Sequence, residues 1–316
     1  MSVLVTGASG FVGSALVRHL LRLGMPARAL GRTRPEVDVV FFEGALDDPV
    51  VSKSALDGVD CVVHLAGLAH QIHDSTGDPL ENYRAVNRDL TIALANQAAL
   101  AGVRRLVFIS SIGVNGAVTT ETPFNQFSVP NPHSNYAQSK YEAERALQAL
   151  AEDSGMEFVI IRPPLVYGPN APGNFGNLMH WIGKGVPLPL GAIHNRRSLV
   201  GIDNLVDLII RCINHPAAAN QVLLAGDGED LSTTELLRGV ANAMGKPARL
   251  IPVPAGLLQL GATLLGKNDV AQRLLASLQV DIGKTCELLD WTPPYTVQEG
   301  LRRCFEPTHW RVLGES

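Results

Sequence analysis

Four short apolar runs constrain the fold of this 316-residue chain most strongly. They are rich in β-branched residues, are bounded by turn-forming residues, and read VLVTG, CVVHLAG, RLVFISS and EFVIIRPP. Such runs are typical of strands that are buried on both faces of a sheet. Helical patterns lie between them, over residues 12–23, 80–102 and 135–155. The alternation predicts an α/β fold with a Rossmann-like, doubly wound parallel sheet.

The character of the sequence changes after Gly168. Residues 169–200 are rich in Gly, Pro and Asn, and short helical stretches and prolines dominate from about Asp227 onward. Between these parts, DNLVDLIIRCI is expected to be helical and QVLLAG to form one more strand. We therefore predict a Rossmann domain in residues 1–168, to which residues 201–226 return. A smaller substrate-binding lobe would comprise residues 169–200 and 227–316.

Composition narrows the classes of partner. Charged residues make up 18% of the chain, the formal net charge is -4, and no basic run stands out, so no nucleic-acid partner is expected. The four cysteines are scattered without a CxxC pair, which argues against a disulfide framework or a metal site and fits a reducing, cytoplasmic location. The N-terminus enters a strand-like run directly and lacks the basic segment of a secretory signal.

The most apolar stretch outside the strands is AGLLQLGATLLG, residues 255–266. As a helix it is too short to cross a bilayer core of ~30 Å, so no stable membrane insertion is expected. We predict a buried helix or a helix of the substrate lobe, with a role at a membrane surface as the alternative.

The segment TGASGFVG follows the first predicted strand and opens the first predicted helix. Gly7, Gly10 and Gly13 are spaced by three, which lets the turn close and lets backbone N–H groups approach a pyrophosphate at a helix N-terminus. Turn glycines are common, so the position between a strand and a helix carries the prediction of a dinucleotide site.

The second strand and its exit read ARALGRTRP. Gly31 stands where an acidic residue would hold a free ribose 2′-hydroxyl, and Arg32 and Arg34 follow. A guanidinium can bind a 2′-phosphate that a carboxylate would repel. The segment therefore favours NADP(H), with NAD(H) as the alternative cofactor and a solvated basic turn as the non-functional interpretation.

The stretch YAQSK places Tyr136 and Lys140 four residues apart, on one face of a predicted helix. A nearby ammonium and a cationic nicotinamide would lower the pKa of the tyrosine and suit it to proton transfer. The motif alone occurs by chance. What strengthens it is FISSIGVNG at the end of an earlier strand, where Ser110 or Ser111 can offer a hydroxyl at the carboxyl edge of the sheet.

With these motifs the chain resembles the extended short-chain dehydrogenase/reductases over nearly its whole length. The resemblance rests on TGASGFVG, HLAG, the serine pair, YAQSK and IIRPPLVYGP, and further on NLM, RRSLVGIDNLVDLI and VDIGKTCELLDWTPPYTVQEGL. The later motifs are similar to those of the branch that acts on nucleotide-sugars.

The resemblance implies roles by position. It implies that Ser111, Tyr136 and Lys140 are catalytic, and that Ser111 also meets the substrate. It implies a cofactor site formed by Gly7, Gly10, Phe11, Val12, Gly13, Arg32, Arg34, Leu65, Ala66, Gly67, Asn87, Tyr136, Lys140 and Pro163. Asn177 and Arg196 would contact a UDP moiety, with Arg197 as the alternative because the register of RRS is ambiguous; the non-functional interpretations are a helix cap and a surface ion pair.

Departures from the family pattern bear on the subclass. Ile112 and Gly113 follow Ser111, where nucleotide-sugar dehydratases have an Asp-Glu pair, so dehydration is not expected. Ala45 replaces an Asp that meets the adenine in many members.

The chain resembles UDP-4-keto-6-deoxy-N-acetylhexosamine 4-reductases of surface-polysaccharide synthesis and UDP-glucose 4-epimerase-like proteins. We expect an NADPH-dependent reductase of a UDP-linked 4-keto sugar. The alternatives are an NAD-dependent UDP-sugar 4-epimerase and a non-catalytic dinucleotide sensor. The predicted helices at 80–102 and 135–153 match those that pair in family homodimers, so a homodimer is expected.

Overall fold

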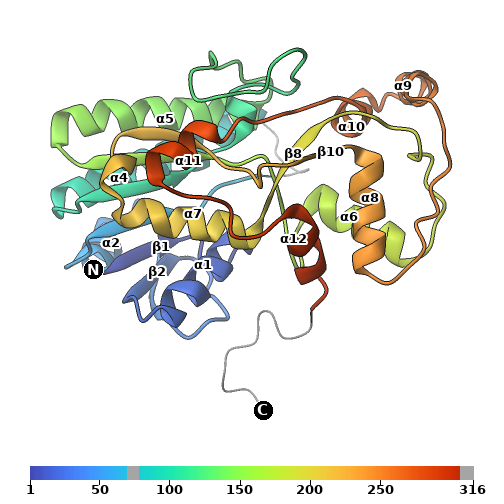
Figure 1. Cartoon of the computed structure of the whole chain (residues 1–316). Helices are drawn as coiled ribbons and strands as arrows, with labels where there is room; N and C mark the ends of the chain where they lie inside the picture. The colour runs from blue at the N-terminus through green and yellow to red at the C-terminus, as the bar shows by residue number, and fades with distance from the viewer. Residues whose placement is uncertain (70–77, 307–316) are drawn as a thin grey trace.

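Seven parallel strands form the centre of the computed structural model, which describes residues 1–69 and 78–306 (Figure 1). Their order in the sheet is β3-β2-β1-β4-β5-β6-β9, so the direction of winding reverses between β1 and β4. The strands are β1 (Val3–Thr6), β2 (Ala27–Gly31), β3 (Val40–Glu43), β4 (Cys61–His64), β5 (Arg105–Ile109), β6 (Glu157–Arg162) and β9 (Gln221–Leu224). The doubly wound α/β fold is confirmed, and β1, β4 and β5 are buried at every position, as their apolar runs predict.

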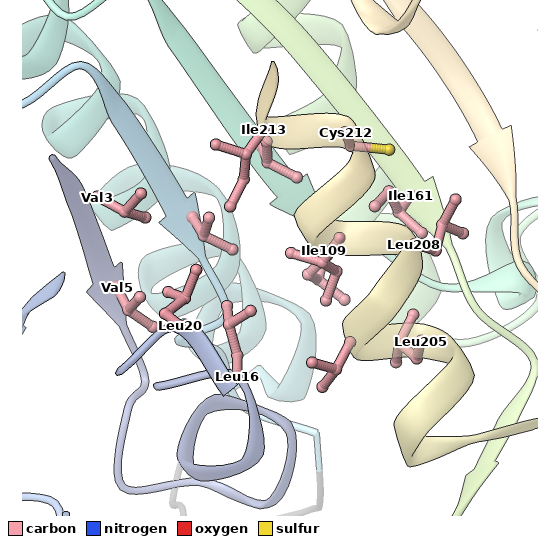
Figure 2. Close-up of a cluster of buried hydrophobic side chains, with 14 of the residues drawn as sticks. Val3, Val5, Leu16, Leu20, Ile109, Ile161, Leu205, Leu208, Cys212 and Ile213 are labelled. Carbon is pink, nitrogen blue, oxygen red and sulfur yellow. The ribbon is translucent and has the colours of Figure 1, made fainter. Parts of the chain in front are cut away.

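Helices α1 (Phe11–Arg22), α7 (Ile202–Asn214) and α11 (Gly283–Leu289) pack on one face of this sheet. In Figure 2, Leu16 and Leu20 of α1 and Leu205 and Leu208 of α7 meet apolar strand side chains such as Val5. The helix predicted at residues 12–23 and the later helix of the DNLVDLIIRCI motif therefore share one apolar layer.

The other face is covered by α2 (Pro49–Leu56), α4 (Leu90–Leu100) and α5 (Asn135–Ser154). Ser134 caps α5 by accepting a hydrogen bond from the Ala137 N–H over 3.1 Å, and Gly155 ends it with a φ of +72°. The predicted helix at residues 80–102 is interrupted: α3 (Pro79–Arg84) passes through a π-helical turn (Ala85–Asp89) into α4. Such turns are frequent at functional sites.

Three strands form a second sheet: β7 (Leu165–Tyr167), β8 (Arg197–Gly201) and β10 (Asp230–Leu231). We call this sheet and the helices that pack with it the smaller lobe; β7 falls within the residues predicted for the Rossmann domain. The helices of the lobe are α6 (Gly173–Gly183), α8 (Thr233–Ala243), α9 (Ala255–Leu264), α10 (Asn268–Leu275) and α12 (Val297–Arg303). They have an apolar core of their own, with Phe175 and Leu237 fully buried. Residues 307–316 of the predicted lobe lie outside the described residues.

The apolar helix α9 lies at the periphery of this lobe (Figure 1). No residue of α9 is buried, so the expectation of a buried helix is wrong; Leu258 is partly buried against the apolar core of this lobe. The apolar composition of a helix does not by itself determine whether its side chains are buried, because burial depends on the segments that pack against it. Among the described helices, none has the length and apolar character needed to span a membrane.

Candidate active site

The candidate site lies at the carboxyl edge of the large sheet, where β1, β4, β5 and β6 end side by side. Each strand ends within one residue of its neighbour in the register, since Thr6 pairs with His64, His64 with Phe108, and Ile109 with Ile161. The residues that follow these strands therefore meet at one edge: Gly7, Leu65 to Gly67, Ser110 and Ser111, and Pro163. Ligands bind at this edge in open α/β sheets, next to the point where the strand order reverses.

The glycine turn fits a dinucleotide pyrophosphate. Gly7 has a φ of +70°, and a Cβ there would lie 2.6 Å from the Ala66 nitrogen. A Cβ at Gly13 would collide with the Gly7 carbonyl, so α1 can approach β1 only without one. Gly10 begins α1 with no capping hydrogen bond from a described side chain, which leaves the first N–H groups of a long helix available to an anion. Phe11 and Val12 form the first turn behind it.

The structure brings Ser111 and Tyr136 together. Ser111 lies two residues after the end of β5 and caps a 3₁₀ turn (Ile112–Val114), and Tyr136 lies in the first turn of α5. The pKa of Tyr136 is raised to about 12, chiefly by burial and also by the neighbouring Tyr83, while Ser111 acts in the opposite direction. The ring of Tyr83 lies edge-on to Tyr136, with the ring centroids 6.1 Å apart.

Lys140 lies one turn further along α5 and is almost fully buried. Its Nζ donates a hydrogen bond to the Ile109 carbonyl over 2.9 Å and lies 4.4 Å from the centroid of the Phe108 ring. Burial lowers the pKa of Lys140 to about 8, and Glu144 partly opposes this effect. Of the groups around Tyr136, Ser111 is the one that lowers the pKa of the phenol.

Asn87 lies in the π-helical turn and has no exposed surface. Its Oδ1 accepts a hydrogen bond from the Leu68 N–H over 2.7 Å, and its Nδ2 donates one to the Ser139 hydroxyl over 3.0 Å. Ser139 in turn donates to the Tyr136 carbonyl. Asn87 thus connects the loop that follows β4 with the helix that contains Tyr136 and Lys140.

Sequence reasoning noticed HLAG as a motif but missed the role of the His64 side chain. His64 Nδ1 lies 2.6 Å from the Thr6 hydroxyl, and Nε2 lies 2.8 Å from the Thr91 hydroxyl. Burial, with a smaller effect of Lys140, lowers the pKa of His64 to about 3, so the ring is neutral. Thr91 already donates to the Asn87 carbonyl, so it accepts from Nε2–H, and Nδ1 accepts from Thr6. The sequence did carry a signal for this contact: the adjacent apolar strands β1 and β4 each end in a polar residue, Thr6 and His64.

Ser110 differs from Ser111 in its surroundings. It is buried, and its hydroxyl has no hydrogen-bond partner among the described residues. Pro163, at the end of β6, accepts a hydrogen bond from the Ile112 N–H and so fixes the start of the 3₁₀ turn.

Arg32 and Arg34 follow β2 and are both exposed. Arg34 stacks on Phe41, with its guanidinium carbon 5.2 Å from the ring centroid. A Cβ at Gly31, the last residue of β2, would meet no atom within 4 Å. The end of β2, where a cofactor ribose would lie, therefore has two exposed cations and, at Gly31, no side chain.

The three residues expected at a UDP moiety all lie in the smaller lobe but differ in environment. Asn177 is exposed on α6, and Arg196 is exposed, with its backbone N–H bound to the Ser277 hydroxyl. The Arg197 guanidinium donates to the Ala276 carbonyl over 3.0 Å, and burial lowers its pKa. Among the described residues no ion pair involves Arg197. A partly buried, unneutralised cation is suited to a diphosphate.

Contacts between loops connect Arg197 to the serine side of the site. The Thr119 N–H donates to the Ser277 carbonyl, and the Phe124 N–H donates to the Gln279 carbonyl. The segment 277–281 is thus fixed between the chain that follows Ser111 and β8, which begins at Arg197. Within the described part of the chain, no cluster of three or more His, Cys, Asp or Glu residues could hold a metal ion.

Comparison with known proteins agrees with this arrangement. Residues 3–226 match the NAD dependent epimerase/dehydratase family. The UDP-glucose 4-epimerase of Vibrio cholerae is 46% identical over 307 residues, which cover 96% of this chain and 94% of that protein. The structure of a Thermus thermophilus UDP-glucose 4-epimerase in complex with NAD is 26% identical, with a TM-score of 0.77 over 96% of this chain and 97% of that chain. A UDP-glucose 4-epimerase structure from Thermotoga maritima, 22% identical, shares the fold with a TM-score of 0.78 over 96% of this chain and 97% of that one.

The glycine turn, the Ser111–Tyr136 contact and the family match agree with one another. The chain therefore belongs to the NAD dependent epimerase/dehydratase family and is an NAD(P)-dependent enzyme of the extended short-chain dehydrogenase/reductase type.

Proposed function

We propose that the protein catalyses oxidation and reduction at C4 of a UDP-linked hexose. The observation that carries this proposal is that Ser111, after β5, and Tyr136, in the first turn of α5, meet at the carboxyl edge of the sheet, where Ser111 lowers the pKa of the buried phenol. A sugar alcohol becomes a ketone only if a proton leaves its oxygen while a hydride leaves its carbon. Tyr136 exchanges that proton, and Ser111 donates a hydrogen bond to the sugar oxygen.

A bound nicotinamide dinucleotide supplies the hydride acceptor or donor. Gly7, Gly10 and Gly13 would hold its pyrophosphate, and Lys140 and Asn87 line the side of α5 where its ribose would lie. With a pKa of about 12, Tyr136 is protonated at neutral pH, the form that donates a proton to a ketone oxygen being reduced. The oxidation half-reaction needs the phenolate, and a positive charge near Tyr136 would favour it.

Epimerisation at C4 is the outcome that the comparisons support best. The Vibrio cholerae UDP-glucose 4-epimerase matches 96% of this chain, so the resemblance includes the substrate lobe as well as the cofactor domain. In an epimerase the 4-keto intermediate is reduced from its opposite face by the same cofactor molecule. Tyr136 would then act as base and as acid within one turnover.

Net reduction of a UDP-linked 4-keto-6-deoxy-N-acetylhexosamine by NADPH is the second candidate. The exposed Arg32 after β2 and the absence of a side chain at Gly31 favour it, because together they suit a ribose 2′-phosphate. A reductase must exchange its cofactor in every turnover, whereas an epimerase retains it.

One pair of assays separates the candidates. Purified protein is given UDP-glucose or UDP-N-acetylglucosamine without added cofactor, and separately a UDP-4-keto-6-deoxy sugar with NADPH. A C4 epimer formed at constant nicotinamide absorbance supports the first candidate, and stoichiometric loss of NADPH absorbance supports the second. If neither sugar reacts while the dinucleotide is bound, the proposal of C4 chemistry on a UDP-sugar is wrong.

For the diphosphate we propose Arg197 as the main contact, with Asn177 nearby, because Arg197 is partly buried whereas Arg196 is exposed.

We also propose a cytoplasmic location, since all four cysteines are free thiols. A homodimer would form through α4 and α5, which pack side by side. Light scattering at micromolar concentration would measure its mass.

A further inference from the structure

Helix α9 exposes a row of leucines to solvent. Leu257 is 61% exposed, Leu260 58% and Leu264 80%, and Leu265, just after the helix, is 72% exposed. Helices on the surface of globular proteins normally direct their apolar face to the core and polar residues to water. α9 has the reverse arrangement, and we call Leu257, Leu260 and Leu264 its leucine face.

The leucine face follows from helical geometry. The three residues are three and four positions apart, so they project from one side of the helix. The side toward the lobe is occupied by Leu258, which packs against the lobe core. A third side carries Gln259 and Thr263, whose side chains both form hydrogen bonds with Asn268 at the start of α10. The helix is therefore anchored on two sides, and the leucine face is left outside the protein.

The charged residues that precede and follow α9 in the chain are mostly basic. Residues 250–266 include no charged residue, and the first charges on either side are Arg249 and Lys267. Between Glu235 and Asp281 the chain has a single acidic residue, Asp269, whereas its basic residues are Arg238, Lys246, Arg249, Lys267 and Arg273. The chain as a whole has a net charge of -4, so this segment differs in sign from the rest. Lys267 and Arg273 are exposed, and no ion pair within residues 78–306 involves them.

The leucine face lies close in the chain to the candidate site. α10 ends at Leu275, and the next carbonyl, that of Ala276, accepts the hydrogen bond from Arg197. The backbone of Ser277 is bound to Thr119 in the loop that follows Ser111. Helix α9 packs against α10, and α10 leads directly into the segment that borders the site.

We propose that the leucine face and its flanking cations, Lys267 and Arg273, dock peripherally on the surface of an anionic lipid bilayer. Apolar side chains on a short helix enter the boundary between head groups and acyl chains, and nearby Lys and Arg residues are attracted to anionic head groups. Self-association through α9 fits the charges less well. A two-fold contact places the same patch on both sides, and so brings the cations Lys267 and Arg273 of both copies into one interface.

The test is co-sedimentation of the full-length protein with vesicles of phosphatidylglycerol and phosphatidylcholine, compared with vesicles of phosphatidylcholine alone. We expect binding to the anionic vesicles. The triple variant Leu257→Gln, Leu260→Gln, Leu264→Gln should bind roughly tenfold more weakly or worse, because three apolar contacts are lost. The matched control is Leu23→Gln, Val40→Gln, Val50→Gln, which changes three exposed apolar residues of the other domain and should bind like the unmodified protein.

The charged part is tested separately. Lys267→Gln with Arg273→Gln should weaken binding by about fivefold for each charge removed, and the loss should be largest at low salt. Lys53→Gln with Arg145→Gln, two exposed cations elsewhere, should change little. The proposal is overturned if the unmodified protein does not sediment with anionic vesicles, or if the triple leucine variant binds as well. It is equally overturned if light scattering shows a dimer that the triple variant abolishes, since a second copy would then cover the face.

Discussion

The Ser111 hydroxyl, two residues beyond the end of β5, acts on the phenol of Tyr136 in the first turn of α5 and lowers its pKa. The two residues are far apart in the chain and meet because a strand end and a helix start lie at the same edge of the sheet. Burial keeps the Tyr136 phenol protonated, and Ser111 is the group that acts against this effect.

Replacement of Tyr136 by Phe removes only the hydroxyl, so the fold and cofactor binding should survive. Turnover should fall ~10²–10⁴-fold, the range for a positioned acid/base. Ser111→Ala should lose somewhat less, because water can partly replace one donor. Single-turnover kinetics with bound cofactor would measure this, and Tyr141→Phe on the same helix is the matched control. Near-normal turnover of the Tyr136 variant would mean that another group transfers the proton.

The buried ammonium of Lys140 should make the stability of the cofactor-free protein depend on pH. Its pKa is about 8 in the fold and near 10.5 in the unfolded chain, so the unfolded chain binds more protons between these values. Stability should therefore rise from pH 7 to pH 9.5, by about 2 kcal/mol from this group.

Lys140→Met should abolish that part of the pH dependence, and the variant should lose activity. Urea unfolding of both proteins at the two pH values measures the difference, with the exposed Lys53→Met as the control. An equal pH dependence in the unmodified protein and in Lys140→Met would show that the ammonium is solvated rather than buried.

Cofactor choice should depend on the residues after β2. If Arg32 binds a 2′-phosphate, Arg32→Ala should weaken NADPH binding by roughly ten- to hundredfold and leave NADH binding unchanged, since a charge-assisted bond contributes ~1.5–3 kcal/mol. Gly31→Asp, which has room for its Cβ, should weaken NADPH and strengthen NADH. Calorimetric titration of both cofactors measures these changes. Equal affinity for the two cofactors in the unmodified protein would contradict the prediction.

The two neighbouring arginines of the lobe should behave differently. Arg197→Ala should weaken UDP binding roughly tenfold or more, because a partly desolvated cation is lost from the diphosphate. Arg196→Ala, a change at an exposed position next to it, should have little effect. The dissociation constants of UDP for the two variants check this directly, and the reverse order would return the role to Arg196.

The sequence alone predicted the features that depend on residues close together in the chain. The apolar runs predicted β1, β4, β5 and β6, because strands buried on both faces have little room for polar residues. The spacing of Gly7, Gly10 and Gly13 predicted the turn, since a Cβ at Gly7 or Gly13 would overlap backbone atoms. The four-residue spacing of Tyr136 and Lys140 placed them on one helix face by geometry alone.

Other features depended on which segments meet in space. The sequence allowed either Arg196 or Arg197 at the lobe, and only the pairing of β8 with the segment near Leu278 determined which is buried. The pKa of Tyr136 follows from burial beside Tyr83 and from Ser111, neither of which is near it in sequence. For α9, composition established an apolar helix, but only the packing of Leu258 on the lobe core decided that Leu257, Leu260 and Leu264 face solvent. Burial belongs to the whole fold, because it depends on the neighbours that tertiary contacts bring to each side chain.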